Sequence, residues 1–321
     1  MSHEFESGAF RRPAWHQLGE TFTNSRDVDQ CVSEAGMDYT IEKKPSQVLV
    51  DSDMPGYHKT VEVPGQYHLV HSTDNKIVSP QTVRNKYTVL QPSTQIDVLR
   101  EYVDQGWATV DGIFSLYDGG SDVVCLQLDA QQSVTGDESE YQHYMVVQNF
   151  HGRGACRGKL VSFRVVCHNT ATAAFGSKGV LSDWKIPHTA SIGDRYKVAC
   201  RTWENVKAQI TEQAKILGLF AEHELDVPKC ISDILGIDED SSTRAINQRD
   251  LILSYADLDA NNVGDNALTV YNSFTGWATH HAGGKAGKEV TSRLESQFSG
   301  DRGKKEQLAA DHLMQLVATS S

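Results

Sequence analysis

The side chains best suited to binding chemistry lie between Phe150 and Arg201. Nine Lys or Arg residues stand there against two Asp, a net charge of +7 within a chain whose net charge is −12. The cations are Arg153, Arg157, Lys159, Arg164, Lys178, Lys185, Arg195, Lys197 and Arg201. Positive charge held in one region is what a phosphate backbone requires. The pattern therefore predicts a polyanionic partner, with pairing to the chain's own acidic segments as the alternative.

The sharpest motif in this region is Gly152-Arg-Gly-Ala-Cys-Arg-Gly-Lys, which holds three glycines and three cations between two expected strands. Glycines let a loop backbone approach a phosphate closely. The spacing matches neither the dinucleotide fingerprint nor the Walker pattern, so nucleotide hydrolysis is not expected. Phe150 or His151 would stack a base, which favours single-stranded nucleic acid. A flexible hairpin, with Phe150 and Phe163 in the core, is the alternative.

No catalytic or metal constellation is expected. The six cysteines lie far apart and lack the close pairing of zinc sites. Cys167 and His168 are adjacent, and neighbouring residues of a strand point to opposite faces, so they are a poor nucleophile and base. We therefore expect a protein that is not an enzyme and that uses no metal or cofactor.

The elements that must position these residues begin as β structure. Alternating segments at 39–45, 47–50, 59–63 and 67–71 predict strands separated by Pro55-Gly56 and Pro64-Gly65. A helix follows from Pro92 to Gly106. Four more strands are expected at 107–117, 123–129, 144–149 and 158–166, with the polar segment 131–142 connecting the middle pair. The simplest topology is an antiparallel β-meander.

Helical spacing dominates the rest of the chain. Trp203, Val206, Ile210, Ala214 and Leu217 recur at three or four residues and predict a long amphipathic helix. Further helices are expected within 222–247, at 267–281 and at 305–318. Tyr271, Phe274 and Trp277 share a helix face that is typical of packing.

The predicted fold class is therefore α+β, with an antiparallel meander packed against the long helix. The predicted division is an amino-terminal extension at 1–40, a central nucleic-acid-binding domain at 41–220 and a helical carboxy-terminal region with a basic tail at 221–321.

Bulk properties suggest where the protein works. No stretch approaches the roughly 20 apolar residues that span a bilayer. The start, Met1-Ser-His-Glu-Phe-Glu-Ser, lacks a basic segment followed by an apolar run, so no secretory signal is expected. We expect a cytoplasmic protein without a membrane partner.

Several motifs resemble one family. Phe163-Arg-Val-Val-Cys-His-Asn-Thr and Met145-Val-Val-Gln-Asn-Phe-His-Gly resemble the hallmark of a phage/plasmid-like protein family of unknown function. Further segments resemble family elements in the same order over nearly the full length: Pro13-Ala-Trp-His-Gln-Leu-Gly, Arg84-Asn-Lys-Tyr-Thr-Val-Leu, Pro187-His-Thr-Ala and Tyr271-Asn-Ser-Phe-Thr-Gly-Trp. The chain departs from the family at Gln148-Asn-Phe-His-Gly, where Ser/Asn-His-Asp-Gly is common, and at Ala171, where Leu is usual. A role tied to that loop Asp is not carried over.

The resemblance implies a remote similarity to phage single-strand annealing proteins, which bind single-stranded DNA, assemble as rings or filaments and pair complementary strands. We therefore expect a homo-oligomer that acts in a bacterial host cell on recombination or replication of a mobile element. A single-strand-binding protein or an exonuclease is a further candidate partner. The alternative is a mobile-element protein that antagonises a host restriction or defence protein. Its DNA-like acids would include Asp137, Glu138, Glu140 and the segment 238–240.

Overall fold

The computed structural model describes residues 5–11, 19–53, 56–117, 119–134, 137–152, 154–164, 182–200, 203–238, 240–280 and 301–320. The chain divides into two compact units, each built from separated segments. The first takes Met1–Leu126, Val147–Gly158 and Trp184–Thr202, and the second takes Gln127–Val146, Lys159–Asp183 and Trp203–Ser321. The domain boundaries expected at residues 40 and 220 stay predictions.

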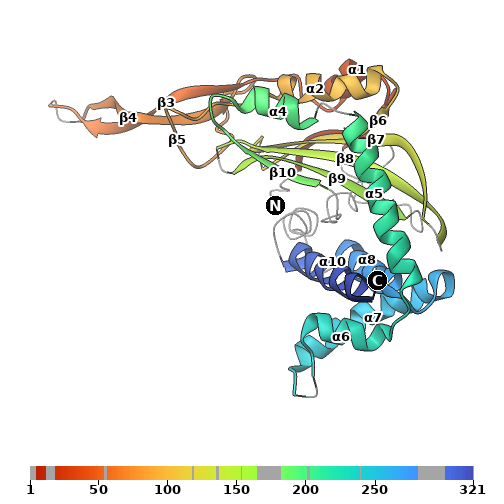
Figure 1. The fold of residues 1–321 in the computed structure, drawn as a ribbon. Helices are drawn as coiled ribbons and strands as arrows, with labels where there is room; N and C mark the ends of the chain where they lie inside the picture. The colour runs from red at the N-terminus through yellow and green to blue at the C-terminus, as the bar shows by residue number, and fades with distance from the viewer. Residues whose placement is uncertain are drawn as a thin grey trace. The chain divides into compact units, whose positions relative to one another are not determined.

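A seven-stranded sheet contains the predicted meander. Its strands are β1 (Phe5–Phe10), β2 (Glu20–Thr21), β6 (Ala108–Leu116), β7 (Ser121–Val134), β8 (Asp137–Phe150), β9 (Ala155–Arg164) and β10 (Ser182–Pro187). The order is β10-β9-β8-β7-β6-β1-β2, so β6 to β10 are neighbours both in the chain and in the sheet (Figure 1). The α+β class, the antiparallel sheets and the helical carboxy-terminal region are confirmed.

The middle pair of meander strands is longer than predicted. The polar segment 131–142 was expected to connect two strands, yet β7 continues to Val134 and β8 begins at Asp137. Val134 and Tyr141 are 3% and 5% exposed, and both belong to the apolar cluster of the second unit. The sequence around these two apolar residues is polar, so it gives no alternating pattern that would indicate the strands.

Three helices belong to the first unit: α1 (Val28–Glu34), α2 (Pro92–Asp104) and α4 (Ile192–Cys200). α2 begins at a proline, as predicted, and buries Ile96, Leu99 and Val103. Gly106 follows with φ +72°, a conformation that suits glycine. α4 is joined to α2 by the Tyr196 hydroxyl, which donates to the Gln95 carbonyl at 2.9 Å.

A three-stranded sheet, β3 (Ile41–Asp51), β4 (His58–His71) and β5 (Val83–Arg84), also belongs to the first unit. β3 and β4 form a long antiparallel hairpin, which we call the arm (Figure 1). Pro64-Gly65 was expected to separate two strands, but β4 continues through it. The register shifts between Pro45 and Gln47, and Gly65 adopts φ +70°, so a bulge absorbs the irregularity.

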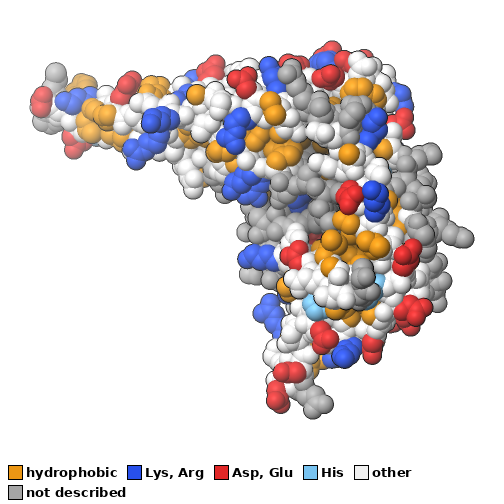
Figure 2. Space-filling view, in the orientation of Figure 1, with side chains coloured by type: hydrophobic (Ala, Val, Ile, Leu, Met, Phe, Trp, Pro, Cys, Tyr) orange, Lys and Arg blue, Asp and Glu red, His pale blue; other side chains and the backbone are white. Residues whose placement is uncertain are grey.

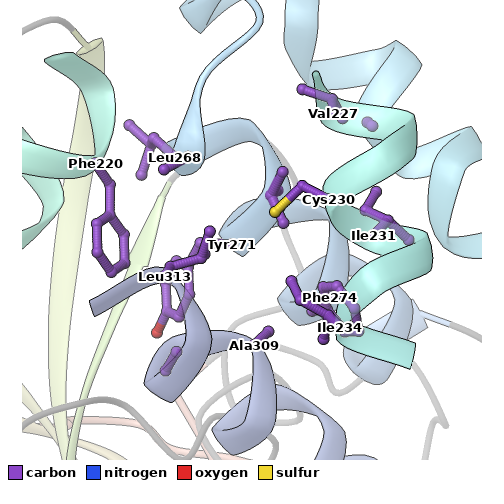
Figure 3. Close-up of a cluster of buried hydrophobic side chains, with 14 of the residues drawn as sticks. Phe220, Val227, Cys230, Ile231, Ile234, Leu268, Tyr271, Phe274, Ala309 and Leu313 are labelled. Carbon is purple, nitrogen blue, oxygen red and sulfur yellow. The ribbon is translucent and has the colours of Figure 1, made fainter. Parts of the chain in front are cut away.

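The described helices of the second unit are α5 (Trp203–Glu222), α6 (Val227–Leu235), α7 (Thr243–Val263), α8 (Ala267–His280) and α10 (Asp301–Ser320). Figure 3 shows side chains of α5, α6, α8 and α10 converging on one apolar cluster. Tyr271, Phe274 and Trp277 are 7%, 0% and 4% exposed, so their predicted packing role is confirmed. Among the described helices, none is both long and apolar enough to cross a bilayer.

Candidate nucleic-acid interface

The β8–β9 hairpin brings an aromatic ring and a guanidinium together. Phe150 ends β8, and Arg157 lies in β9 just beyond the connecting loop. The Arg157 Cζ lies 5.7 Å from the centre of the Phe150 ring, within the range of a cation–π contact. A Cβ on Gly154 would lie 3.2 Å from that of Phe150, and its φ of +105° is one that glycine tolerates. The glycine-rich motif thus lies at a hairpin between β8 and β9, as the sequence predicts.

Arg157 is a cation without an acidic partner among the described residues. Its side chain is partly buried, and its Nε has no hydrogen-bond partner. A guanidinium that is partly withdrawn from water gains from a charge-assisted hydrogen bond to an anion. The arrangement is therefore suited to a phosphate group beside an aromatic ring.

Lys185 lies on the same face of the sheet as Arg157. The Trp184 ring occupies the space over Gly158, where a Cβ would lie only 2.1 Å from its Cζ2. Successive side chains of a strand alternate between faces, so Arg157 and Lys185 both point away from that ring. Lys185 is exposed. Phe150, Arg157 and Lys185 therefore form one group, which we call the β-face cluster.

Arg195 and Lys197 belong to a different surface. Both are exposed on α4, whose Tyr196 packs edge-to-face against Trp184 with ring centres 5.8 Å apart. α4 therefore covers the sheet face opposite the β-face cluster. The expectation of one continuous groove is corrected, because a single sheet separates two groups of cations.

The remaining predicted cations are not gathered on this surface. Lys159 is only 3% exposed, so it does not stand free to track a nucleic-acid backbone. The side chain of Arg164, and all of Arg153, Lys178 and Arg201, lie outside the part of the chain that the structure describes. In the space-filling view, positive and negative side chains alternate over much of the visible surface (Figure 2). The positive charge of the sequence segment is thus divided among several environments.

His151 is a core residue, which corrects its expected role in stacking a base. It is fully buried, and its Nε2 lies 2.6 Å from Oδ2 of Asp122, which is also fully buried. The backbone N–H of His151 donates to the Gly120 carbonyl at 2.9 Å. These contacts fix the end of β8 against the start of β7 and so hold the position of Phe150.

Asp122 is the centre of a buried hydrogen-bond network that sequence reasoning missed. The Tyr39 hydroxyl donates to Asp122 Oδ1 at 2.5 Å, and the Ser115 hydroxyl lies 3.5 Å from the same oxygen. A buried carboxylate requires such partners, because its desolvation is costly. A lone Asp beside a turn gives no sequence signal of this role, since its partners are 7 to 83 residues away in the chain.

A second histidine supports the same loop through Tyr87. The Tyr87 hydroxyl accepts a hydrogen bond from the Gly152 N–H at 2.9 Å, and the Tyr87 ring stacks on His188 at 4.6 Å. His188 Nδ1 lies 3.0 Å from the Thr88 carbonyl. Burial lowers the pKa of His188 to about 4, so the imidazole is neutral at pH 7. The loop is therefore held by neutral rings, and its positive charge comes from arginine.

The described residues offer no activated thiol. Burial raises the pKa of Cys200 to about 12 and that of Cys230 to about 11, which removes thiolate at neutral pH. Cys167 and His168 lie outside the described residues. Within the described ranges, no group of three or more His, Cys, Asp or Glu side chains is placed to hold a metal ion. The expectation that the protein is not an enzyme stays a prediction.

Comparison with known proteins places residues 81–298 in one family model, described as a domain of unknown function (DUF932). This match covers the β-face cluster, α4 and the buried Asp122 network except Tyr39. No curated protein matches the chain, and no solved structure does.

Proposed function

This chain belongs to the DUF932 family, whose function is unknown, and we propose from its own residues that it is a single-stranded DNA-binding protein of the strand-annealing type. It acts, in this proposal, as a homo-oligomer in the recombination or replication of a phage or plasmid. No nucleotide hydrolysis is involved.

The Phe150–Arg157 pair is the observation that carries the proposal. Proteins that bind single strands without sequence preference combine aromatic faces for the bases with cations for the backbone. The 5.7 Å contact places both kinds of group at one hairpin, and Lys185 adds an exposed charge to the same sheet face. Duplex DNA hides its base faces, so an aromatic ring that is only partly buried favours the single strand.

The rigidity of the hairpin supports the same proposal. Asp122 and His151 fix one end of the loop, and Tyr87 accepts from Gly152 at its middle. A preorganised site loses less conformational entropy when a flexible strand binds. The buried network thus positions the binding residues without touching the DNA.

The test is fluorescence anisotropy of a labelled single-stranded oligonucleotide, titrated at low and moderate salt with duplex of the same sequence as competitor. Arg157→Glu should weaken binding and lower the salt slope by about 0.7, the value for one phosphate contact on a single strand. Phe150→Ala should cost about 1–3 kcal/mol of binding free energy, the usual value of one stacked base. The control is Arg244→Glu, which changes the charge equally at an exposed position of α7.

Two results would refute the proposal. One is the absence of binding by the wild type at low salt, which would favour a protein that antagonises a host defence protein. The other is equal loss of affinity in Arg157→Glu and Arg244→Glu, which would reduce the effect to net charge. Circular dichroism of each variant shows whether it keeps the wild-type fold.

A further inference from the structure

The distal part of the arm has a strand edge that no described residue covers. β5 pairs with β4 only at Gln66 and Tyr67, so the segment from His58 to Glu62 has β3 on one side and, within the described ranges, no strand on the other. Exposed strand edges are templates for pairing with another chain. A two-stranded hairpin without further support is marginally stable in water. The arm therefore has both a free edge and a need for a third strand.

The backbone register determines which residues of β4 can pair outward. The Ser52 N–H donates to the Tyr57 carbonyl at 2.9 Å, and the β3–β4 register continues from this pair. Antiparallel pairs alternate between hydrogen-bonded and non-hydrogen-bonded, so Lys59 and Val61 bond to β3. His58, Thr60 and Glu62 then direct their N–H and C=O groups to the free edge.

We propose that two copies of this chain associate by antiparallel pairing of their β4 edges, with Thr60 of each copy on the two-fold axis. The inference rests on the homo-oligomeric part of the proposed function and assigns it a surface. A two-fold axis perpendicular to a sheet pairs residues whose numbers add to a constant, so Thr60 meets Thr60 and His58 meets Glu62. Thr–Thr pairs are among the favourable cross-strand neighbours, and an imidazole N–H can donate a hydrogen bond to a carboxylate.

The complementarity of an imidazole and a carboxylate favours a second copy as the occupant. His58 Nδ1 already lies 3.0 Å from Asp51 Oδ1 within the arm. The pairing places Glu62 of the second copy on the other side of the same imidazole, and symmetry makes this contact twice. The outer edge of β3 offers no equivalent pair of imidazole and carboxylate. Two β3 edges paired about Leu49 would place Gln47 opposite Asp51.

The side-chain faces also match. Val48 and Val61 are cross-strand partners on one face and are 47% and 42% exposed. Figure 2 shows hydrophobic side chains on the surface of the arm. In the paired state, Val61 of each copy lies opposite Lys59 of the other, whose methylene groups cover it. The two valine faces then join into one apolar band across four strands.

The direct test is disulfide trapping of Thr60→Cys. Hydrogen-bonded antiparallel partners have Cα atoms about 5.5 Å apart, within the range of about 4.4–6.8 Å that a disulfide spans. Mild oxidation should therefore give a covalent dimer of the full chain on non-reducing gels. The matched control is Leu49→Cys, which is exposed on β3 across from Thr60 and should stay monomeric.

A second test leaves the cysteines unchanged. Glu62→Lys removes the carboxylate that accepts from His58 at two symmetric positions and should weaken association about tenfold in sedimentation velocity. Gln47→Lys, at the exposed cross-strand partner of Glu62, should leave association unchanged. A monomeric wild type, trapping by Leu49→Cys instead of Thr60→Cys, or equal association of Glu62→Lys and wild type would overturn the inference.

The tests of dimerisation through the arm can be distinguished from the test of DNA binding. Arg157→Glu should dimerise as the wild type does, whereas Glu62→Lys tests the arm alone. If the wild type dimerises through Thr60 but binds no oligonucleotide, the proposed function fails and the arm contact stands.

Discussion

Removal of the His151 imidazole should be among the most destabilising single changes in the first unit. His151 and Asp122 are both fully buried, with 2.6 Å between Nε2 and Oδ2. His151→Ala leaves the carboxylate in the core with hydroxyl donors alone. Removing one partner of a buried hydrogen bond typically costs about 1–3 kcal/mol, and more where the remaining group is charged, because that group is left without its partner. We expect His151→Ala to lower the free energy of unfolding by an amount in that range.

Two comparisons separate this effect from simple loss of volume. Tyr39→Phe keeps the ring and removes the 2.5 Å hydrogen bond to Asp122, so it should cost about 1.5–3 kcal/mol, the value for a bond to a charged group. The double variant Asp122→Asn, His151→Ala should lose less free energy of unfolding than the sum of the two single variants. It leaves no buried carboxylate without its imidazole partner.

The assay is urea denaturation of each variant, followed by tryptophan fluorescence and far-ultraviolet circular dichroism. A cost below about 1 kcal/mol for His151→Ala would refute the reasoning, because it would equal the loss of an ordinary hydrogen bond. The reasoning would also be refuted if the losses of free energy of unfolding in the two single variants added up to the loss in the double variant. An Asp122 carboxylate left without His151 must make the two changes interdependent.

Two further predictions concern packing and pH. Gly158→Ala should destabilise the protein by about 1–3 kcal/mol in thermal unfolding, because its Cβ would lie 2.1 Å from the Trp184 ring, whereas Gly193→Ala in α4 meets no atom within 4 Å and should be neutral or stabilising. Burial lowers the pKa of His143 and His188 to about 4, so the unfolded state binds more protons between about pH 4 and 6.5. Stability should therefore fall as the pH is lowered through this window, and removal of this component in a double His→Gln variant, measured by urea denaturation, checks the assignment.

Much of the fold could be predicted because its signals are local. Pro92 and Gly106 mark the two ends of α2, and the spacing from Trp203 to Leu217 marks α5, which extends to Glu222. The polar segment 131–142 could not be predicted as strand, because Val134 and Tyr141 belong to a cluster whose other members come much later in the chain. Contacts with residues far away in the chain produce no regular spacing of apolar residues in the local sequence.

The candidate site could be predicted only in part, because only some of its signals are local in the sequence. Composition identified Phe150 and Arg157, which the hairpin brings together. It could not separate them from His151 and Lys159, since neighbouring residues of a strand lie in opposite environments. Nor could it assign Arg195 to another surface, because the alternation that places it depends on the contact between Trp184 and Gly158.

The membership of Val134 and Tyr141 in the second unit's cluster has a consequence for synthesis on the ribosome. The two residues are made early, whereas the cluster closes only with Val317 of α10. At translation rates of about 5–20 residues per second, the interval between Tyr141 and Val317 is roughly 9–35 s. Throughout that time the cluster to which the two strand positions belong is incomplete on the nascent chain. A chaperone that shields nascent strands would therefore raise the yield of native protein, and a faster-translated gene would shorten the exposure.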